Sequence, residues 1–198
     1  MTTEMKTYPV NIKGELTGMP SRWLWIFKWL LAIPHYVVLF FLQIAFCVLW
    51  VISFFAIVFT GKYPKSMFNF NLGVLRWMWR VGFYSYSALG TDKYPPFALD
   101  SIPDYPADIS IPYPEKLSQG LVWIKWWLLA IPHWIIISIF ADLIPILVLV
   151  AGIILLFAGT YPADLFKITI GFNRWTYRVC AYAALMTDEY PPFRLWDS

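Results

Sequence analysis

Two histidines, four arginines and one aspartate stand out in this apolar sequence as side chains whose types and spacing could do chemistry. His35 and His133 each follow a proline in the repeated stretch Leu-Leu-Ala-Ile-Pro-His. A histidine there could bind a metal or carry protons, but metal sites usually take three or four ligands. The simpler interpretation is a polar side chain that is hydrogen-bonded near a bend, so we expect no metal and no other cofactor.

The four arginines form two matching pairs. Arg76 and Arg80 recur as Arg174 and Arg178, and residues four apart share one face of a helix. Such a pair can hold a phosphate through bidentate hydrogen bonds, and in a membrane that phosphate would belong to a lipid headgroup. Pairing with carbonyls or carboxylates inside the fold is the alternative, and both stay open. We expect the pairs to face the other half or anionic headgroups, because unpaired guanidinium groups among acyl chains are too costly.

Asp142 is an acidic residue within a long apolar run. If that run is one helix, Asp142 lies roughly 13 Å beyond His133 along it. An ionisable residue at such a depth is a functional candidate. A local role is equally open, since Asp142 could N-cap a helix that restarts with Pro145 in its first turn.

The composition indicates a membrane protein. Of the 198 residues, 60% are apolar and 14% are charged, whereas a soluble domain carries about 25% charged residues. No charged residue occurs between Lys28 and Lys62, an interval longer than the ~20 residues that cross a bilayer. Cys47 and Cys180 lie in apolar helical patterns, which predicts neither a disulfide framework nor a metal site.

The chain is an internal repeat that covers nearly its whole length, with residues 1–104 as the first membrane repeat and 105–198 as the second. Lys-Trp precedes Leu-Leu-Ala-Ile-Pro-His in the first copy and Lys-Trp-Trp precedes it in the second. Lys28 and Lys125 are expected to snorkel toward the headgroup layer among these tryptophans. The elements expected in the two copies are a weak strand (8–12, 105–109), a short amphipathic helix (21–33, 118–131), a bend at Pro34 or Pro132, a spanning helix (35–59, 133–158), a Gly-containing turn and an arginine-bearing helix (65–89, 163–186). Gly73 and Gly171 share the arginine stripes, where a neighbouring helix could approach closely.

Each repeat closes on a nearly identical tag. The tag reads Thr-Asp-Lys-Tyr-Pro-Pro-Phe at 91–97 and Thr-Asp-Glu-Tyr-Pro-Pro-Phe at 187–193. The order of these motifs, from Lys-Trp-Leu-Leu-Ala-Ile-Pro-His to the closing tag, resembles the bacterial membrane-protein family designated domain of unknown function 4389 (DUF4389). The resemblance covers both halves and implies an all-α integral membrane protein with tandem pseudo-symmetric copies. It implies no activity.

Two membrane arrangements are open for the arginine-bearing helices. If they cross, the chain forms two hairpins with four crossings. If they lie in the interface, the chain crosses twice and its halves have opposite orientations. A charge at mid-membrane costs about 2.5–3.5 kcal/mol, which argues against crossing. The hairpins, however, gather most loop lysines and arginines on one side, as the positive-inside rule expects. We therefore favour four crossings, with both termini in the cytoplasm.

No GxGxxG, P-loop, HExxH or GxSxG pattern is present, so we do not expect an enzyme. We expect a multi-pass protein of the inner membrane that acts as a non-enzymatic accessory, scaffold or lipid-interacting protein. Its expected partners are membrane lipids and a second membrane protein or a copy of itself, and not nucleic acid. The alternative is a small transporter or channel that uses Asp142, the histidine pair and the arginine stripes.

Overall fold

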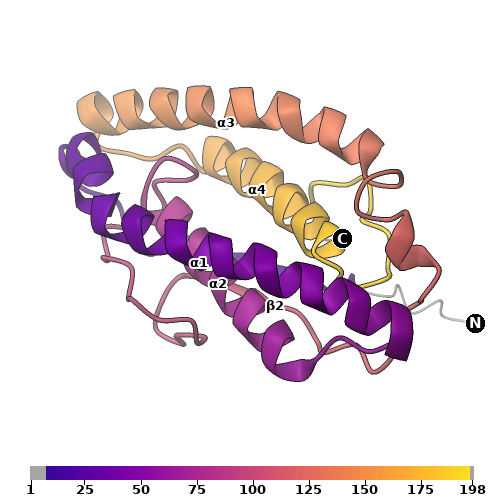
Figure 1. Ribbon diagram of the computed structural model, residues 1–198. Helices are drawn as coiled ribbons and strands as arrows, with labels where there is room; N and C mark the ends of the chain where they lie inside the picture. The colour runs from indigo at the N-terminus through magenta and orange to yellow at the C-terminus, as the bar shows by residue number, and fades with distance from the viewer. Residues whose placement is uncertain (1–7, 197–198) are drawn as a thin grey trace, which may run out of the picture.

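The computed structural model describes residues 8–196, and this part of the chain is mostly helical (Figure 1). The elements in chain order are β1 (Asn11–Gly14), α1 (Leu24–Thr60), α2 (Lys65–Tyr84), β2 (Ala107–Ser110), η1 (Leu121–Trp123), α3 (Ile131–Ala158) and α4 (Ala163–Ala183). The prediction of a helical protein with two tandem repeats is therefore confirmed. The weak strand prediction corresponds to the two four-residue strands.

Each half contains a helix hairpin with the predicted turn. Gly61 and Gly159 follow α1 and α3 in the left-handed conformation, with φ of 67° and 71°. Each glycine donates its N–H to the carbonyl oxygen four residues earlier, and residues with a Cβ rarely adopt this φ. Pro64 and Pro162 then precede α2 and α4. The turn sequence therefore both ends the first helix and starts the second.

The helix end predicted at the first proline is absent. Helix α1 runs unbroken from Leu24 to Thr60 with Pro34 inside it. In the second half, η1 and a series of turns come before α3, which begins at Ile131 with Pro132 in its first turn. The predicted interruption of the helix is therefore wrong for the first repeat only.

One extra tryptophan explains why the two repeats differ here. Lys28 is followed by one tryptophan before Leu-Leu-Ala-Ile-Pro-His, and Lys125 is followed by two. In the second half the N–H of Leu129 donates to the carbonyl oxygen of Ile124, five residues earlier, at 3.0 Å. A bond of this span closes a turn one residue wider than that of an α-helix. The wider turn absorbs the extra residue, so the lysine and the histidine keep the same places in both halves.

The two halves run antiparallel to each other (Figure 1). Late in α1 the chain meets the start of the second half, where the rings of Trp50 and Trp126 lie 5.5 Å apart. Early in α1 it meets the end of α3, where a Cβ on Gly152 would lie 3.1 Å from the ring of Trp25. Two hairpins that enter the membrane from the same side would be parallel, which is not the arrangement of these halves, while the number of membrane crossings stays a prediction. The halves have the opposite orientations that the two-crossing alternative requires.

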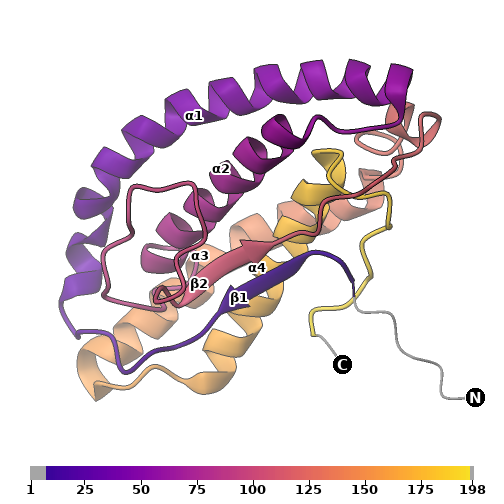
Figure 2. The same cartoon turned by 90° about the horizontal axis from the view of Figure 1, so that it is seen from below.

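The sheet takes one strand from each half. Strands β1 and β2 pair antiparallel with Ile12 opposite Ile109. These isoleucines are equivalent in the repeat, since Tyr-Pro-x-x-Ile ends at both positions. A residue that pairs with its own equivalent lies on the axis relating the halves, so the pseudo-two-fold axis passes through this pair. Figure 2 shows the strands on the side of α2 and α4 away from α1.

Helices α2 and α4 form the middle layer of the molecule. Trp79 and Phe83 of α2 belong to one buried cluster with Ile12, Ile109 and Ile170. The indole N–H of Trp79 donates to a β1 carbonyl oxygen at 2.6 Å. The main core therefore lies between the middle helices and the sheet, and not between α1 and α3.

A loop packs closely against Gly73 and Gly171, where the sequence predicted the close approach of a neighbouring helix. A Cβ on Gly73 would lie 2.7 Å from the Cβ of Leu99, and one on Gly171 would lie 3.2 Å from the Cβ of Leu195. Both leucines follow a closing tag. The glycines therefore let the chain that leaves each repeat cross the second helix of that repeat.

Candidate functional site

Arg76 and Arg80 bind the chain that connects the two repeats. Arg76 donates from Nε to the carbonyl oxygen of Ile109 at 2.7 Å. Arg80 is fully buried and donates to the carbonyl oxygens of Asp100 and Ala98. These oxygens lie in irregular chain or at the sheet edge, where a buried acceptor needs a donor from elsewhere. The first arginine pair thus satisfies the linker backbone.

The second pair, Arg174 and Arg178, lies on the matching face of α4. Arg178 is buried, and its guanidinium group lies 5.6 Å from the ring of Tyr8, a residue of the first repeat. Structural pairing, one of the two alternatives from the sequence, accounts for Arg76 and Arg80. Contact with lipid phosphate stays a prediction.

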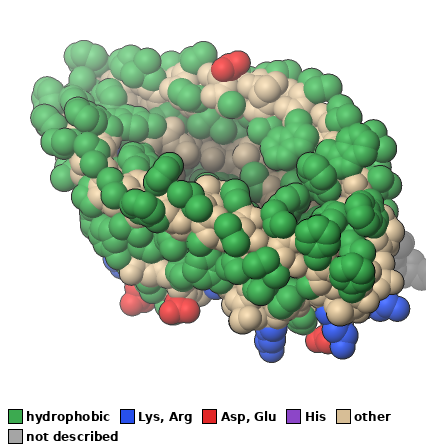
Figure 3. Space-filling view, in the orientation of Figure 1, with side chains coloured by type: hydrophobic (Ala, Val, Ile, Leu, Met, Phe, Trp, Pro, Cys, Tyr) green, Lys and Arg blue, Asp and Glu red, His purple; other side chains and the backbone are tan. Residues whose placement is uncertain are grey.

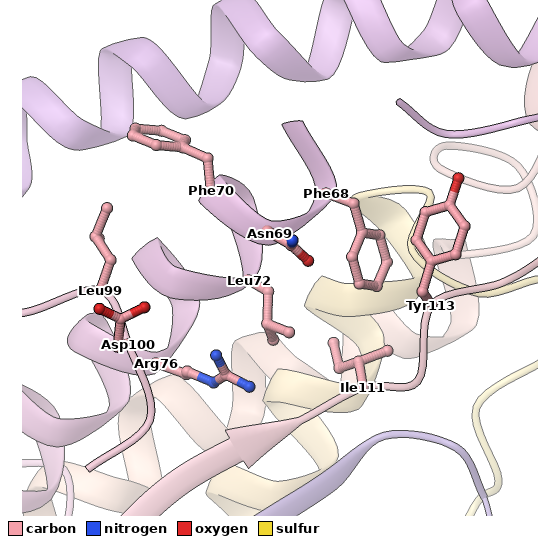
Figure 4. Close-up of a pocket in the computed structure, with 9 residues that line it drawn as sticks. All are labelled: Phe68, Asn69, Phe70, Leu72, Arg76, Leu99, Asp100, Ile111 and Tyr113. Atoms are coloured by element: carbon pink, nitrogen blue, oxygen red, sulfur yellow. The ribbon is translucent and has the colours of Figure 1, made fainter. Parts of the chain in front are cut away.

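A pocket lies beside each arginine stripe. The first has a volume of about 510 Å³, and Figure 4 shows Arg76 and Asp100 on one side of it. The second, of about 280 Å³, is lined by Arg174 and by Lys167, which takes the place of Asn69 in the first. The first pocket therefore carries both signs of charge, and the second is basic.

Each histidine is held in an aromatic cluster of its own repeat. The Nδ1 atom of His35 accepts a hydrogen bond from the Trp77 indole N–H at 3.0 Å, and Phe97 of the closing tag stacks on the imidazole with ring centres 3.9 Å apart. An Nδ1 that accepts carries no proton, so the neutral ring holds its proton on Nε2. This geometry agrees with the hydrogen-bonded interpretation. The corresponding residues of the second half are His133, Trp175 and Phe193, with 3.0 Å and 4.4 Å for the two distances.

Replacing Trp77 by phenylalanine is expected to lower the free energy of unfolding by about 1 kcal/mol, because it removes one hydrogen bond to a buried nitrogen and keeps most of the ring. Trp175→Phe should cost about the same. The measurement is a denaturant titration in detergent micelles. Trp29→Phe, at a position that is 54% exposed, is the control and should be near neutral. Equal losses at all three positions would mean that ring size, and not the bond, sets the cost.

Two buried lysines connect the start of each repeat to its closing tag. The Lys28 ammonium group donates to the Thr91 carbonyl oxygen at 2.6 Å and lies 2.9 Å from the Asp92 carboxylate. The other carboxylate oxygen accepts the Ser21 N–H at 2.5 Å. Lys28 is fully buried, so the prediction that it snorkels to the headgroups is wrong. The closing tag supplies a carboxylate closer than the headgroup layer.

The second half repeats this arrangement. Lys125 donates to the Thr187 carbonyl oxygen at 2.9 Å and to the Asp188 carboxylate at 2.7 Å, and the Ser118 N–H donates to Asp188 at 2.6 Å. Burial lowers the pKa of Lys125 from its ordinary value, and the hydrogen bond to Asp188 opposes that change. We call the serine, lysine, threonine and aspartate of each half the clasp. The sequence showed that these residues recur but gave no sign that they meet.

Asp142 lies exposed on α3 and is not an N-cap. Helix α3 is continuous from Ile131 to Ala158 with Pro145 inside it, so no helix restarts there. The histidines occupy separate clusters, and the first arginine pair contacts the linker. The side chains that the channel hypothesis needs therefore do not converge.

A groove lies between α1 and α3, with α2 and α4 as its floor. It consists of adjoining cavities of about 240, 500 and 320 Å³ that all include Met78 in their lining. Figure 3 shows the hollow on this side of the molecule, surrounded by apolar side chains. Helices α1 and α3 carry one charged residue each: Lys28, which is buried, and Asp142, which is exposed. We call the groove and the exposed side chains of α1 and α3 the apolar face.

These features define a tandem-repeat helical protein in which α1 and α3 are, by length and composition, apolar enough to cross a membrane. The family described as Domain of unknown function (DUF4389) matches residues 22–98 and 121–194, and the chain belongs to this family. The resemblance inferred from the motifs is thus confirmed, and the matches coincide with the two helix hairpins. No curated protein and no solved structure was found to match the chain.

Proposed function

We propose that this protein is a non-enzymatic, lipid-interacting scaffold or accessory protein of the bacterial cytoplasmic membrane. The observation that carries the proposal is the apolar face. Phe59 and Phe157, for example, are 77% and 79% exposed at the ends of α1 and α3. Soluble monomers rarely expose a contiguous apolar surface of this extent. Acyl chains would cover it without directional bonds, because the hydrophobic effect is non-directional.

The contacts of the polar side chains support a structural role over a catalytic one. Each histidine accepts a hydrogen bond from a tryptophan, each clasp lysine is paired with the closing tag, and Arg76 and Arg80 serve the linker. Groups engaged in this way hold the fold together. We propose that acyl chains fill the groove, whose cavities reach the lower part of the size range of small-molecule sites.

The test places a bimane fluorophore on Cys47, which is exposed and lines the groove, in a Cys180→Ala background. The protein is reconstituted in vesicles whose phosphatidylcholine carries brominated acyl chains. We expect strong quenching at Cys47 and weak quenching at Gln119→Cys, an exposed position between the two family matches. Weak quenching at both positions would contradict lipid contact. Cross-linking of Cys47 between two copies would assign the face to self-association instead.

A further inference from the structure

The polar side of the molecule follows α1 along its length. The linker begins where Phe97 stacks on His35, in the first third of α1. It ends where the Leu117 N–H donates to the carbonyl oxygen of Gly61, just past α1, at 2.8 Å. We call β1, β2 and residues 98–117 the polar face. The linker exposes polar side chains between these points, at Asp100, Ser101, Asp104, Ser110 and Glu115.

A membrane-spanning orientation would place this polar face in hydrocarbon. The ends of α1 would lie at opposite membrane surfaces, and the linker would cross the bilayer along the flank of the protein. Irregular backbone and open sheet edges are not found facing lipid, because nothing there bonds their N–H and C=O groups. The Ile12–Ile109 pair, on the pseudo-two-fold axis, would lie near the midplane with the exposed Lys13 beside it.

Asp142, on the side of the molecule opposite the polar face, also argues against a membrane-spanning orientation. It is exposed and stands twelfth in the 28-residue helix α3. If α3 crossed the membrane, this carboxylate would face acyl chains near the bilayer centre, where ionisable side chains are normally shielded by protein or water. A helix that lies at the interface keeps such a side chain close to the headgroups.

The length of α1 also fits poorly with a crossing. Its 37 residues extend about 55 Å at 1.5 Å per residue, against a hydrocarbon core of about 30 Å. A helix that lies in the plane of the membrane has no such limit.

We infer that α1 and α3 lie in the plane of the membrane, within one leaflet, with the apolar face toward the acyl chains and the polar face in water. The inference rests on the proposed lipid contact and adds the orientation. Interfacial helices bury an apolar face about 5–10 Å deep and keep their polar side wet. Tryptophans exposed near the ends of the helices, among them Trp23, Trp29 and Trp123, then lie at headgroup depth, which such rings favour.

The test is labelling with a membrane-impermeant maleimide in sealed vesicles, before and after permeabilisation. Single cysteines replace Ser21, Ser66 and Ser110 in a background without Cys47 and Cys180. The first two lie at opposite ends of α1, and all three are exposed. We expect all three to be labelled from the same side of the membrane. The native Cys47, kept in a Cys180→Ala background, is the control, since it is exposed and lines the groove, and it should stay unlabelled until detergent is added.

Two results would overturn the inference in distinguishable ways. Labelling of Ser21→Cys and Ser66→Cys from opposite sides, with Ser110→Cys unreactive, would show that the helices cross and that a partner covers the polar face. The proposed lipid contact would survive that result. Rapid labelling of Cys47 from water would instead remove the apolar face from lipid, and the proposed function would fail with it.

Discussion

Replacing Asp92 by alanine is expected to lower the free energy of unfolding by about 3 kcal/mol, because the variant leaves a buried ammonium group without its counter-charge. Lys28 would keep one carbonyl partner, that of Thr91, and the Ser21 N–H would lose its acceptor. Asp188→Ala should have a similar effect through Lys125. Denaturant titration in detergent micelles measures both. Asp104→Ala, on the exposed linker, should change little.

The double variant Lys28→Met/Asp92→Ala tests the cause. It removes the buried charge together with its partner, so it should be more stable than Asp92→Ala alone. A double variant as unstable as the sum of the single ones would show that packing, and not the unpaired charge, sets the loss.

The pH dependence in the second clasp follows from the sign of the Lys125 shift. A lysine whose pKa is lowered in the folded state destabilises the fold while it is protonated, and the penalty fades as pH rises toward its ordinary pKa. Without Asp188 the carboxylate that opposes the lowering by burial is gone. The deficit of Asp188→Ala against the parent protein should therefore shrink as the pH rises toward the ordinary pKa of lysine.

Replacing Arg80 by methionine is expected to cost about 3 kcal/mol, because two linker carbonyl oxygens lose charged donors and such bonds contribute about 1.5–3 kcal/mol each. Methionine retains the apolar length of the side chain. The free energy of unfolding should fall, and limited proteolysis should cut residues 98–106 faster. Lys93→Met is the matched control, since Lys93 donates to one linker carbonyl oxygen from an exposed position. A neutral Arg80→Met with a protected linker would mean that other contacts hold this segment.

The elements of the fold followed from the sequence, and their relative orientation did not. The Gly-x-Tyr-Pro turns and the helical spacing of Arg76 and Arg80 are local signals, so they predicted the hairpins. The parallel arrangement was favoured because it gathers most loop lysines and arginines on one side, as the positive-inside rule expects. Contacts between the halves and the linker instead set the orientation. The bond from Arg80 to a linker carbonyl oxygen is one such long-range contact, and it leaves no mark in the spacing of the sequence.

The second tryptophan after Lys125 was visible in the sequence, but its consequence was not. An insertion in a helix can rotate everything after it or be absorbed by a bulge. The choice depends on what holds both sides, which here are the clasp and the stacking of Phe193 on His133. The clasp itself was missed because Lys28 and Asp92 lie far apart in sequence. The internal repeat shows which residues occur in both copies, but it does not show which of them are in contact.

The pairing of Ile12 with Ile109 gives the chain the architecture of a two-fold dimer joined into one polypeptide. Each repeat contributes one strand, and neither can close the sheet alone. Two separate copies would have to find each other, and their stability would depend on concentration. The linker makes that meeting intramolecular at a fixed effective concentration. It also lets the copies diverge, as Asn69 and Lys167 have done beside the two arginine stripes.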